Sequence, residues 1–177
     1  MSALPICTIG HSTRSIAEFV DLLRVGEATM VVDVRTVPRS RHNPQYNLDV
    51  LAGELAAYQL RHEYIRELGG LRCKAAEIAP EVNGLWRNQS FHNYADYALT
   101  ESFREGLDRL LTLAETERCA IMCAEAVWWR CHRRIIADYL LAGGRSVLHL
   151  MGPDRAEPAS LTPGAVACDG VVTYPAG

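Results

Sequence analysis

The strongest constraint on the fold is a set of short, almost entirely apolar runs, separated by longer stretches with helical spacing. Met30 to Val34 and Cys119 to Cys123 are two such runs. A strand without a polar face is typical of a parallel sheet covered by helices on both sides, because a strand with one wet face alternates apolar and polar residues. Strand-like and helix-like segments alternate along the chain, which is the order of an α/β protein.

A chain of 177 residues is of ordinary size for one domain. We expect a single α/β domain over residues 1–150, with a mostly parallel open sheet of about five strands and helices on both faces. The expected strands cover residues 5–9, 30–34, 63–65, 119–123 and 146–150, and one expected helix runs from about Trp129 to Ala142. Residues 151–177 carry several prolines and are predicted to form an irregular tail with at most one short strand, at Val171 to Tyr174.

Charge and cysteine content exclude several classes of protein. The net charge of -3 and the pI near 6.1 give no overall positive field, so any site for an anion must be local. The six cysteines form no CxxC pair and follow no secretory signal, so we expect reduced thiols in a cytoplasmic protein. No apolar stretch approaches the roughly 20 residues that span a bilayer, and no membrane role is predicted.

Ionisable residues follow three of the expected strands, at the ends where open parallel sheets bind ligands. The first strand leads to His11 and Ser12, and the second leads to Asp33 and Arg35. The apolar run that begins at Cys119 leads to Cys123 and Glu125. On the helix that follows, the apolar spacing turns Cys131 and His132 inward. Near a helix start the helix dipole lowers the pKa of a thiol and attracts anions.

These motifs together resemble the family called domain of unknown function 488. The matching motifs are Thr8 to Ser12, Asp33 to Arg35 with Pro38 and Ser40, Leu68 to Gly70, Phe91 with Tyr94 and Ala95, Cys123 to Glu125, and Cys131 to Arg133. The resemblance covers about residues 6–150 and implies a small α/β domain of undetermined activity. Ala126 to Trp129 replace a usually more polar loop, so the substrate preference is expected to differ.

The leading hypothesis is an enzyme that hydrolyses an anionic, phosphate-bearing substrate such as a nucleotide or a nucleic acid. In this hypothesis side chains with suitable acid–base chemistry move protons, and arginines bind the anion. The candidate catalytic residues are Glu125, Asp33, His11, Cys131 and His132, and the candidate substrate-binding residues are Ser12, Arg35, Ser40, Arg133 and Tyr94. For several of them a structural role is the alternative: Asp33 and Arg35 as an ion pair and Glu125 as a helix cap. A tyrosine such as Tyr94 is more often a core residue than a ligand.

Two other hypotheses stay open. An apolar strand that ends in Cys123, followed by a loop, an arginine and a helix, is similar in layout to rhodanese-type sulfur-transfer domains, with Cys123 or Cys131 as the reactive thiol. A non-catalytic module could instead bind nucleic acid or protein through the loop from Arg39 to His42 and the two adjacent tryptophans.

No cofactor is predicted. A zinc ion bound by a subset of Cys123, Glu125, Cys131, His132 and His11 is the alternative. The spacing argues against it, because the usual two-residue gaps are missing and neighbouring cysteine and histidine seldom bind the same ion.

Overall fold

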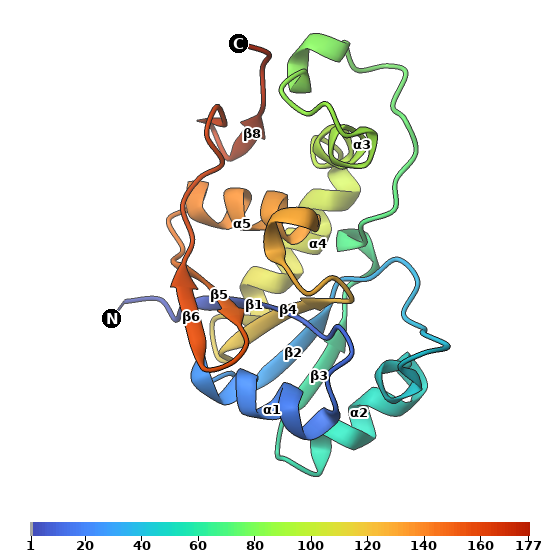
Figure 1. Cartoon of the computed structure of the whole chain (residues 1–177). Coiled ribbons are helices and arrows are strands. Elements are labelled where there is room, and N and C mark those ends of the chain that lie inside the picture. The colour runs from blue at the N-terminus through green and yellow to red at the C-terminus, as the bar shows by residue number, and fades with distance from the viewer. Residues whose placement is uncertain (1) are drawn as a thin grey trace.

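The computed structural model describes residues 2–177 and contains a six-stranded sheet in the order β3-β2-β4-β1-β5-β6 (Figure 1). The strands are β1 Ile6–Gly10, β2 Met30–Asp33, β3 Arg61–Tyr64, β4 Cys119–Cys123, β5 Val147–Met151 and β6 Arg155–Pro158. The first five run parallel, and β6 pairs antiparallel with β5. The expectation of one α/β domain with a mostly parallel sheet is therefore confirmed, with one strand more than expected.

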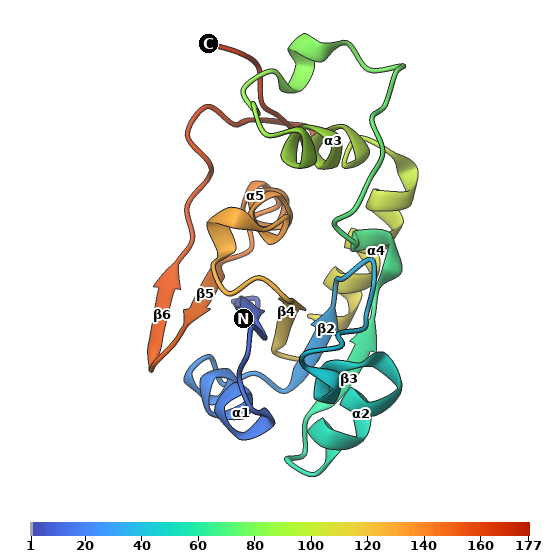
Figure 2. The same cartoon turned by 45° about the vertical axis from the view of Figure 1, so that its right-hand side comes forward.

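Helices cover both faces of this sheet, as Figure 1 and Figure 2 show. They are α1 Ile16–Val25 and α2 Leu48–Ala56 on one face, and α3 Gln89–Tyr97, α4 Glu101–Leu113 and α5 Arg133–Ala142 on the other. Each face has its own apolar core, and all five residues of β4 are buried between the two cores. This double burial is the physical reason for the apolar runs in the sequence. In the described part of the chain, no helix combines the length and apolar character that crossing a membrane requires.

The C-terminal segment differs from the irregular tail that the sequence indicates. β6 extends the sheet, and β7 (Val166–Cys168) pairs with β8 (Val171–Thr173) as a separate hairpin. Tyr174 is fully buried, and its hydroxyl donates a hydrogen bond of 2.7 Å to the buried carboxylate of Asp138. The tail is ordered by such tertiary contacts with α5, which local sequence pattern does not reveal.

Three strand ends meet at one edge of the sheet. β4 is the central strand, flanked by β1 and β2, and Gly10 lies in register with Cys123 while Asp33 lies in register with Met122. The backbone N–H of His11 donates to the Cys123 carbonyl at 2.9 Å, so the chain beyond β1 stays next to the chain beyond β4. This convergence positions the candidate site.

Candidate functional site

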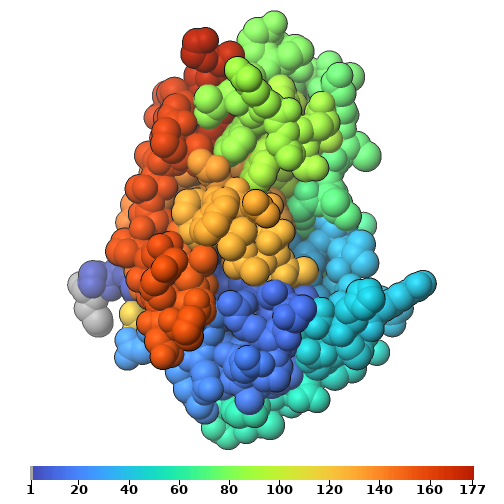
Figure 3. Space-filling model, in the orientation of Figure 1, coloured from blue at the N-terminus to red at the C-terminus, as the bar shows by residue number. Residues whose placement is uncertain are grey.

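A cavity of about 300 Å³ opens at this edge, between the ends of β2 and β4, the segment after β3 and the start of α3. In Figure 3 the segment between β4 and α5 lies on the visible surface, between the α1 segment and α3. The lining consists of Arg35, Thr36, Val37, Gly70, Leu71, Ser90, Phe91, Cys123, Ala124, Glu125, Arg130, Cys131 and His132. Four of the sequence-predicted site residues are among them: Arg35, Glu125, Cys131 and His132.

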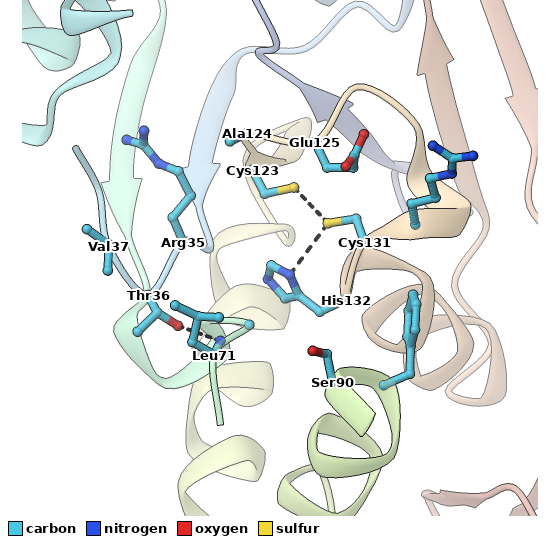
Figure 4. Close-up of a pocket in the computed structure, with 13 residues that line it drawn as sticks. Arg35, Thr36, Val37, Leu71, Ser90, Cys123, Ala124, Glu125, Cys131 and His132 are labelled. Atoms are coloured by element: carbon cyan, nitrogen blue, oxygen red, sulfur yellow. Dashed lines mark hydrogen bonds between the residues drawn. The ribbon is translucent and has the colours of Figure 1, made fainter. Parts of the chain in front are cut away.

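Two thiols lie in contact in the wall of this cavity (Figure 4). Cys123 ends β4, and the Sγ atoms of Cys123 and Cys131 are 2.7 Å apart. Both side chains are buried, at 4% and 5% exposure. The chain between them forms a short 3₁₀ turn at Trp128–Arg130, and α5 begins only at Arg133. The predicted helix start near Trp129 is therefore wrong, because the loop needs those residues to bring one thiol back to the other.

His132 is oriented towards the thiol pair by a backbone contact. Its Nε2 lies 2.7 Å from the carbonyl oxygen of Val34, and its Nδ1 lies 3.5 Å from the Sγ of Cys131. A carbonyl only accepts, so Nε2 carries a proton and Nδ1 is the atom that exchanges a proton with the thiol. Gly70 makes room for the ring, because a Cβ at this position would overlap Nδ1.

Arg133 is the largest fully buried side chain of the described residues, at 1% exposure. Its Nε donates to the Sγ of Cys131 at 3.2 Å, and its Nη2 donates to the carbonyl oxygen of Glu125 at 2.5 Å. The backbone N–H of Arg133 also points at the same sulfur, at 3.5 Å. A buried cation is stable only with a compensating charge or acceptors, and the Cys131 sulfur and the Glu125 carbonyl are the acceptors here.

The two thiols are electrostatically different. Burial alone raises the pKa of Cys131, but the hydrogen bond from the Cys123 thiol and the positive charges of His132 and Arg133 outweigh burial and hold this pKa well below its ordinary value. For Cys123, burial and the hydrogen bond to Cys131 both raise the pKa well above its ordinary value. Cys131 is therefore the thiol of the pair that ionises more readily, and Cys123 is the one that keeps its proton more tightly.

Asp33, Arg35 and His11 form a separate buried network beside the cavity. The Arg35 guanidinium makes a two-pronged ion pair with Asp33, at 2.9 and 2.7 Å, and also donates to the Tyr46 carbonyl at 2.6 Å. His11 bonds through Nδ1 to the Ser12 carbonyl, at 2.8 Å, and its Nε2 accepts from Arg35 at 3.4 Å. Burial is the main cause that lowers the pKa of His11 to about 4, so the ring is neutral at neutral pH.

The remaining predicted residues lie apart from the thiol pair. Ser40 sits in the loop before α2, where its backbone N–H donates to Asn47 and its hydroxyl accepts from the backbone N–H of Asn43. Tyr94 is fully buried on α3 and donates its hydroxyl hydrogen bond to the Leu68 carbonyl at 2.8 Å. Its ring touches His132 edge-on, so its place is behind the site rather than in the cavity lining.

Several residues of the cavity have no signal in the sequence that marks them as functional. Gly70 ends the motif Leu68 to Gly70, to which the sequence assigns no function, and Thr36, Leu71 and Ser90 belong to loops or helix ends without a recognisable motif. The backbone N–H of Leu71 donates to the hydroxyl of Thr36 at 2.8 Å, which joins the segment after β3 to the segment after β2. Only the folded chain brings these positions together.

The Cys/His cluster also has the atom types that zinc prefers. The ligand atoms of Cys123, Cys131 and His132 all lie within 4.8 Å of one another. Two sulfurs bound to one tetrahedral zinc ion at about 2.3 Å would lie roughly 3.7 Å apart. Here they are 2.7 Å apart, which is closer than one tetrahedral zinc ion would hold them.

A buried histidine supports the loop between the two cysteines. His149 on β5 stacks on Trp128, with ring centroids 4.2 Å apart, and its Nδ1 contacts the Thr8 hydroxyl at 2.8 Å. Burial, with a smaller contribution from Arg133, lowers the pKa of His149 to about 4. The ring is therefore packed in its neutral form.

Acid is expected to destabilise the protein through His149. Between its ordinary pKa of 6.5 and its folded-state pKa of about 4, the unfolded chain binds a proton that the folded chain does not. The free energy of unfolding should fall over this range by up to roughly 3 kcal/mol from this residue. Urea unfolding of wild type and His149→Asn at both ends of the range measures the effect. An equal loss in the two proteins would contradict it.

A family model described as "Domain of unknown function DUF488" matches residues 15–140, well over half of the chain. The matched segment includes both cysteines of the thiol pair with His132 and Arg133, and it begins after His11 and Ser12. No curated protein and no solved structure shows significant similarity to the chain.

Proposed function

The chain belongs to the family described as domain of unknown function DUF488, and from this premise we propose that it is a sulfur-transfer enzyme. In this proposal Cys131 is the nucleophile and Cys123 is the second thiol. The observation that carries the proposal is the contact of two thiols in one cavity wall, with the cationic partners gathered on only one of them. A thiolate beside a protonated thiol is the arrangement that attacks a sulfur–sulfur bond and then exchanges the product.

The proposed first step transfers one sulfur atom. The Cys131 thiolate attacks the outer sulfur of a sulfane-sulfur donor, a new S–S bond forms, and the old S–S bond breaks with its electron pair on the leaving group. Cys131 then carries a persulfide. An acceptor thiolate attacks the outer sulfur and restores the Cys131 thiolate, or the Cys123 thiol attacks the inner sulfur, and its proton leaves with the outer sulfur as hydrosulfide, so that a Cys123–Cys131 disulfide remains.

His132 and Arg133 are assigned to the thiolate in this reaction. Arg133 and its backbone N–H donate to the Cys131 sulfur, so the negative charge is stabilised before the donor binds. His132 takes the thiol proton at Nδ1, because Nε2 is held by the Val34 carbonyl. These groups are fixed by burial and backbone contacts, and so require little reorganisation during the reaction.

Hydrolysis of an anionic substrate has less support from the contacts. Asp33 is fully buried and both of its oxygens accept from Arg35, so it is not free to move a proton. His11 is bonded at both ring nitrogens. Glu125 lines the cavity, but its exposed carboxylate makes no hydrogen bond within residues 2–177 that would fix it as a general base.

We also propose that the protein works in the reducing environment of the cytoplasm. All six cysteines are free in residues 2–177, and the two in the cavity are close enough to oxidise readily. In an oxidising compartment such a pair would close into a disulfide and block the first step.

Mass spectrometry of the sulfur-loaded protein tests the function. After a brief treatment with inorganic polysulfide and rapid alkylation, we expect one added sulfur atom on the peptide that contains Cys131. Cys73 and Cys168 are exposed free thiols in the same chain and serve as internal controls for unselective reaction. No added sulfur on Cys131, or equal labelling of the exposed controls, would refute the proposed function.

A further inference from the structure

We propose that the sulfur donor of this site is an organic thiosulfonate, in which the sulfane sulfur is attached through a sulfonyl group to an apolar body, rather than inorganic thiosulfate. The inference rests on the proposed sulfur-transfer function and specifies its substrate class. It follows from the apolar mouth of the cavity, from the shortage of free positive charge in it, and from its size.

The mouth of the cavity exposes large apolar side chains. Leu71 is 68% exposed and Val37 is 58% exposed, the two highest values among the large apolar residues of the described chain. Both line the cavity, and half-buried Phe91 lines it as well. Figure 4 shows Val37 and Leu71 on the side of the cavity opposite Glu125, with the thiol pair between. Exposed apolar side chains in the lining of a cavity beside a reactive group favour an apolar ligand.

The cavity has little positive charge to offer a small dianion. The guanidinium of Arg35 is taken up by Asp33 and the Tyr46 carbonyl, and that of Arg133 by Cys131 and the Glu125 carbonyl. His132 is held between the Val34 carbonyl and the Cys131 sulfur. Arg130 is the remaining arginine of the lining, and its exposed side chain makes no hydrogen bond or ion pair within residues 2–177. One such arginine suits a single negative charge. A thiosulfonate carries one, whereas thiosulfate carries two.

The size of the cavity agrees with a compact organic group. A benzene-sized ligand occupies a cavity of about 150 Å³. The cavity of about 300 Å³ therefore has room for an aromatic ring or a short alkyl chain together with the sulfonyl group.

The reaction with this donor balances without another reactant. The Cys131 thiolate attacks the outer sulfur of R–SO₂–S⁻, where R is the apolar body. The S–S bond of the donor breaks, and the sulfinate R–SO₂⁻ leaves with the electron pair. The enzyme retains the persulfide Cys131–S–S⁻, so the negative charge stays beside the Arg133 guanidinium.

The test compares three donors at equal concentration: benzenethiosulfonate, methanethiosulfonate and thiosulfate. For each donor, the rate of Cys131 persulfide formation is divided by the rate at which the same donor transfers sulfur to a small free thiol. This ratio corrects for differences in the intrinsic reactivity of the donors. We expect wild type to prefer benzenethiosulfonate over thiosulfate by about tenfold or more, because the ring buries apolar surface at the cavity mouth. Methanethiosulfonate should fall between them.

Leu71→Asn is expected to lower this preference severalfold, because the loss of apolar surface slows loading by benzenethiosulfonate more than loading by thiosulfate. Leu161→Asn is the matched control, because Leu161 is also exposed, at 41%, and does not line the cavity. An unchanged preference in Leu71→Asn, or equal corrected rates for the three donors in wild type, would overturn the inference while the proposed function stands. Absence of a persulfide with every donor would instead refute the function itself.

Discussion

Cys131→Ser is expected to abolish persulfide formation, with a loss on the order of 10³ or more in the rate of loading from any donor. A serine hydroxyl is not ionised at neutral pH, and no other thiol of the described chain has the same set of donors around its sulfur. Cys123 has a raised pKa and lies deeper in the strand end, so it cannot replace the missing thiolate. Loading of the intact protein, followed by mass spectrometry, measures the loss.

Cys123→Ser is the matched variant and should separate the two steps. Serine can still donate a hydrogen bond towards the Cys131 sulfur, so the first transfer should persist within about tenfold of wild type. The persulfide should then accumulate, because no neighbouring thiol displaces hydrosulfide from it. If Cys123→Ser abolished loading and Cys131→Ser did not, the roles of the two cysteines would be reversed.

The fold of residues 1–150 was predictable because strands that are buried on both faces of a sheet appear in the sequence as continuous apolar runs. β4 is apolar at every position, and the alternation of such runs with helical spacing admits few other architectures. The C-terminal segment leaves no such mark. Val172 and Tyr174 are fully buried against α5, but they lie in short stretches among prolines and polar residues, and their order depends on contacts with distant residues such as Asp138.

The site was predictable only as a location. The rule that ligands bind at the carboxyl ends of parallel strands brings together the ends of β1, β2 and β4, and the register of these strands agrees. The role of each residue depends on partners that sequence spacing does not specify. Asp33 and Arg35 neutralise each other, whereas Arg133 is aimed at a sulfur atom.

The contact between the two thiols also could not be predicted from the sequence. Seven residues lie between Cys123 and Cys131, and many loop paths are compatible with that number. The observed path depends on Gly10, because a Cβ at this position would overlap the Glu125 carbonyl, and on the stacking of Trp128 on His149. Both contacts join the loop to strands that are far away in the chain.

Arg133→Met is expected to reduce the reactivity of Cys131 strongly at mildly acidic pH. Methionine has a similar length but donates no hydrogen bond and carries no charge, so the thiolate loses the Nε contact of 3.2 Å. A hydrogen bond to a charged group contributes about 1.5–3 kcal/mol, which corresponds to roughly ten- to hundredfold in the thiolate population. We expect the pKa of Cys131 to rise and its alkylation rate at about pH 6 to fall by that factor.

The pH profile of alkylation distinguishes this effect from a general loss of structure. In a Cys73→Ser/Cys168→Ser background, the profile of wild type should extend well below the ordinary thiol range, and that of Arg133→Met should move towards it. Arg134→Met is the matched control, because Arg134 is adjacent and its side chain bonds to Thr162 and makes no hydrogen bond to the Cys131 sulfur. Since unfolding would expose Cys131 and speed alkylation at high pH, only slower reaction at low pH with an unchanged plateau supports the role of Arg133. A profile that is identical in wild type and Arg133→Met would show that the buried guanidinium does not stabilise the thiolate.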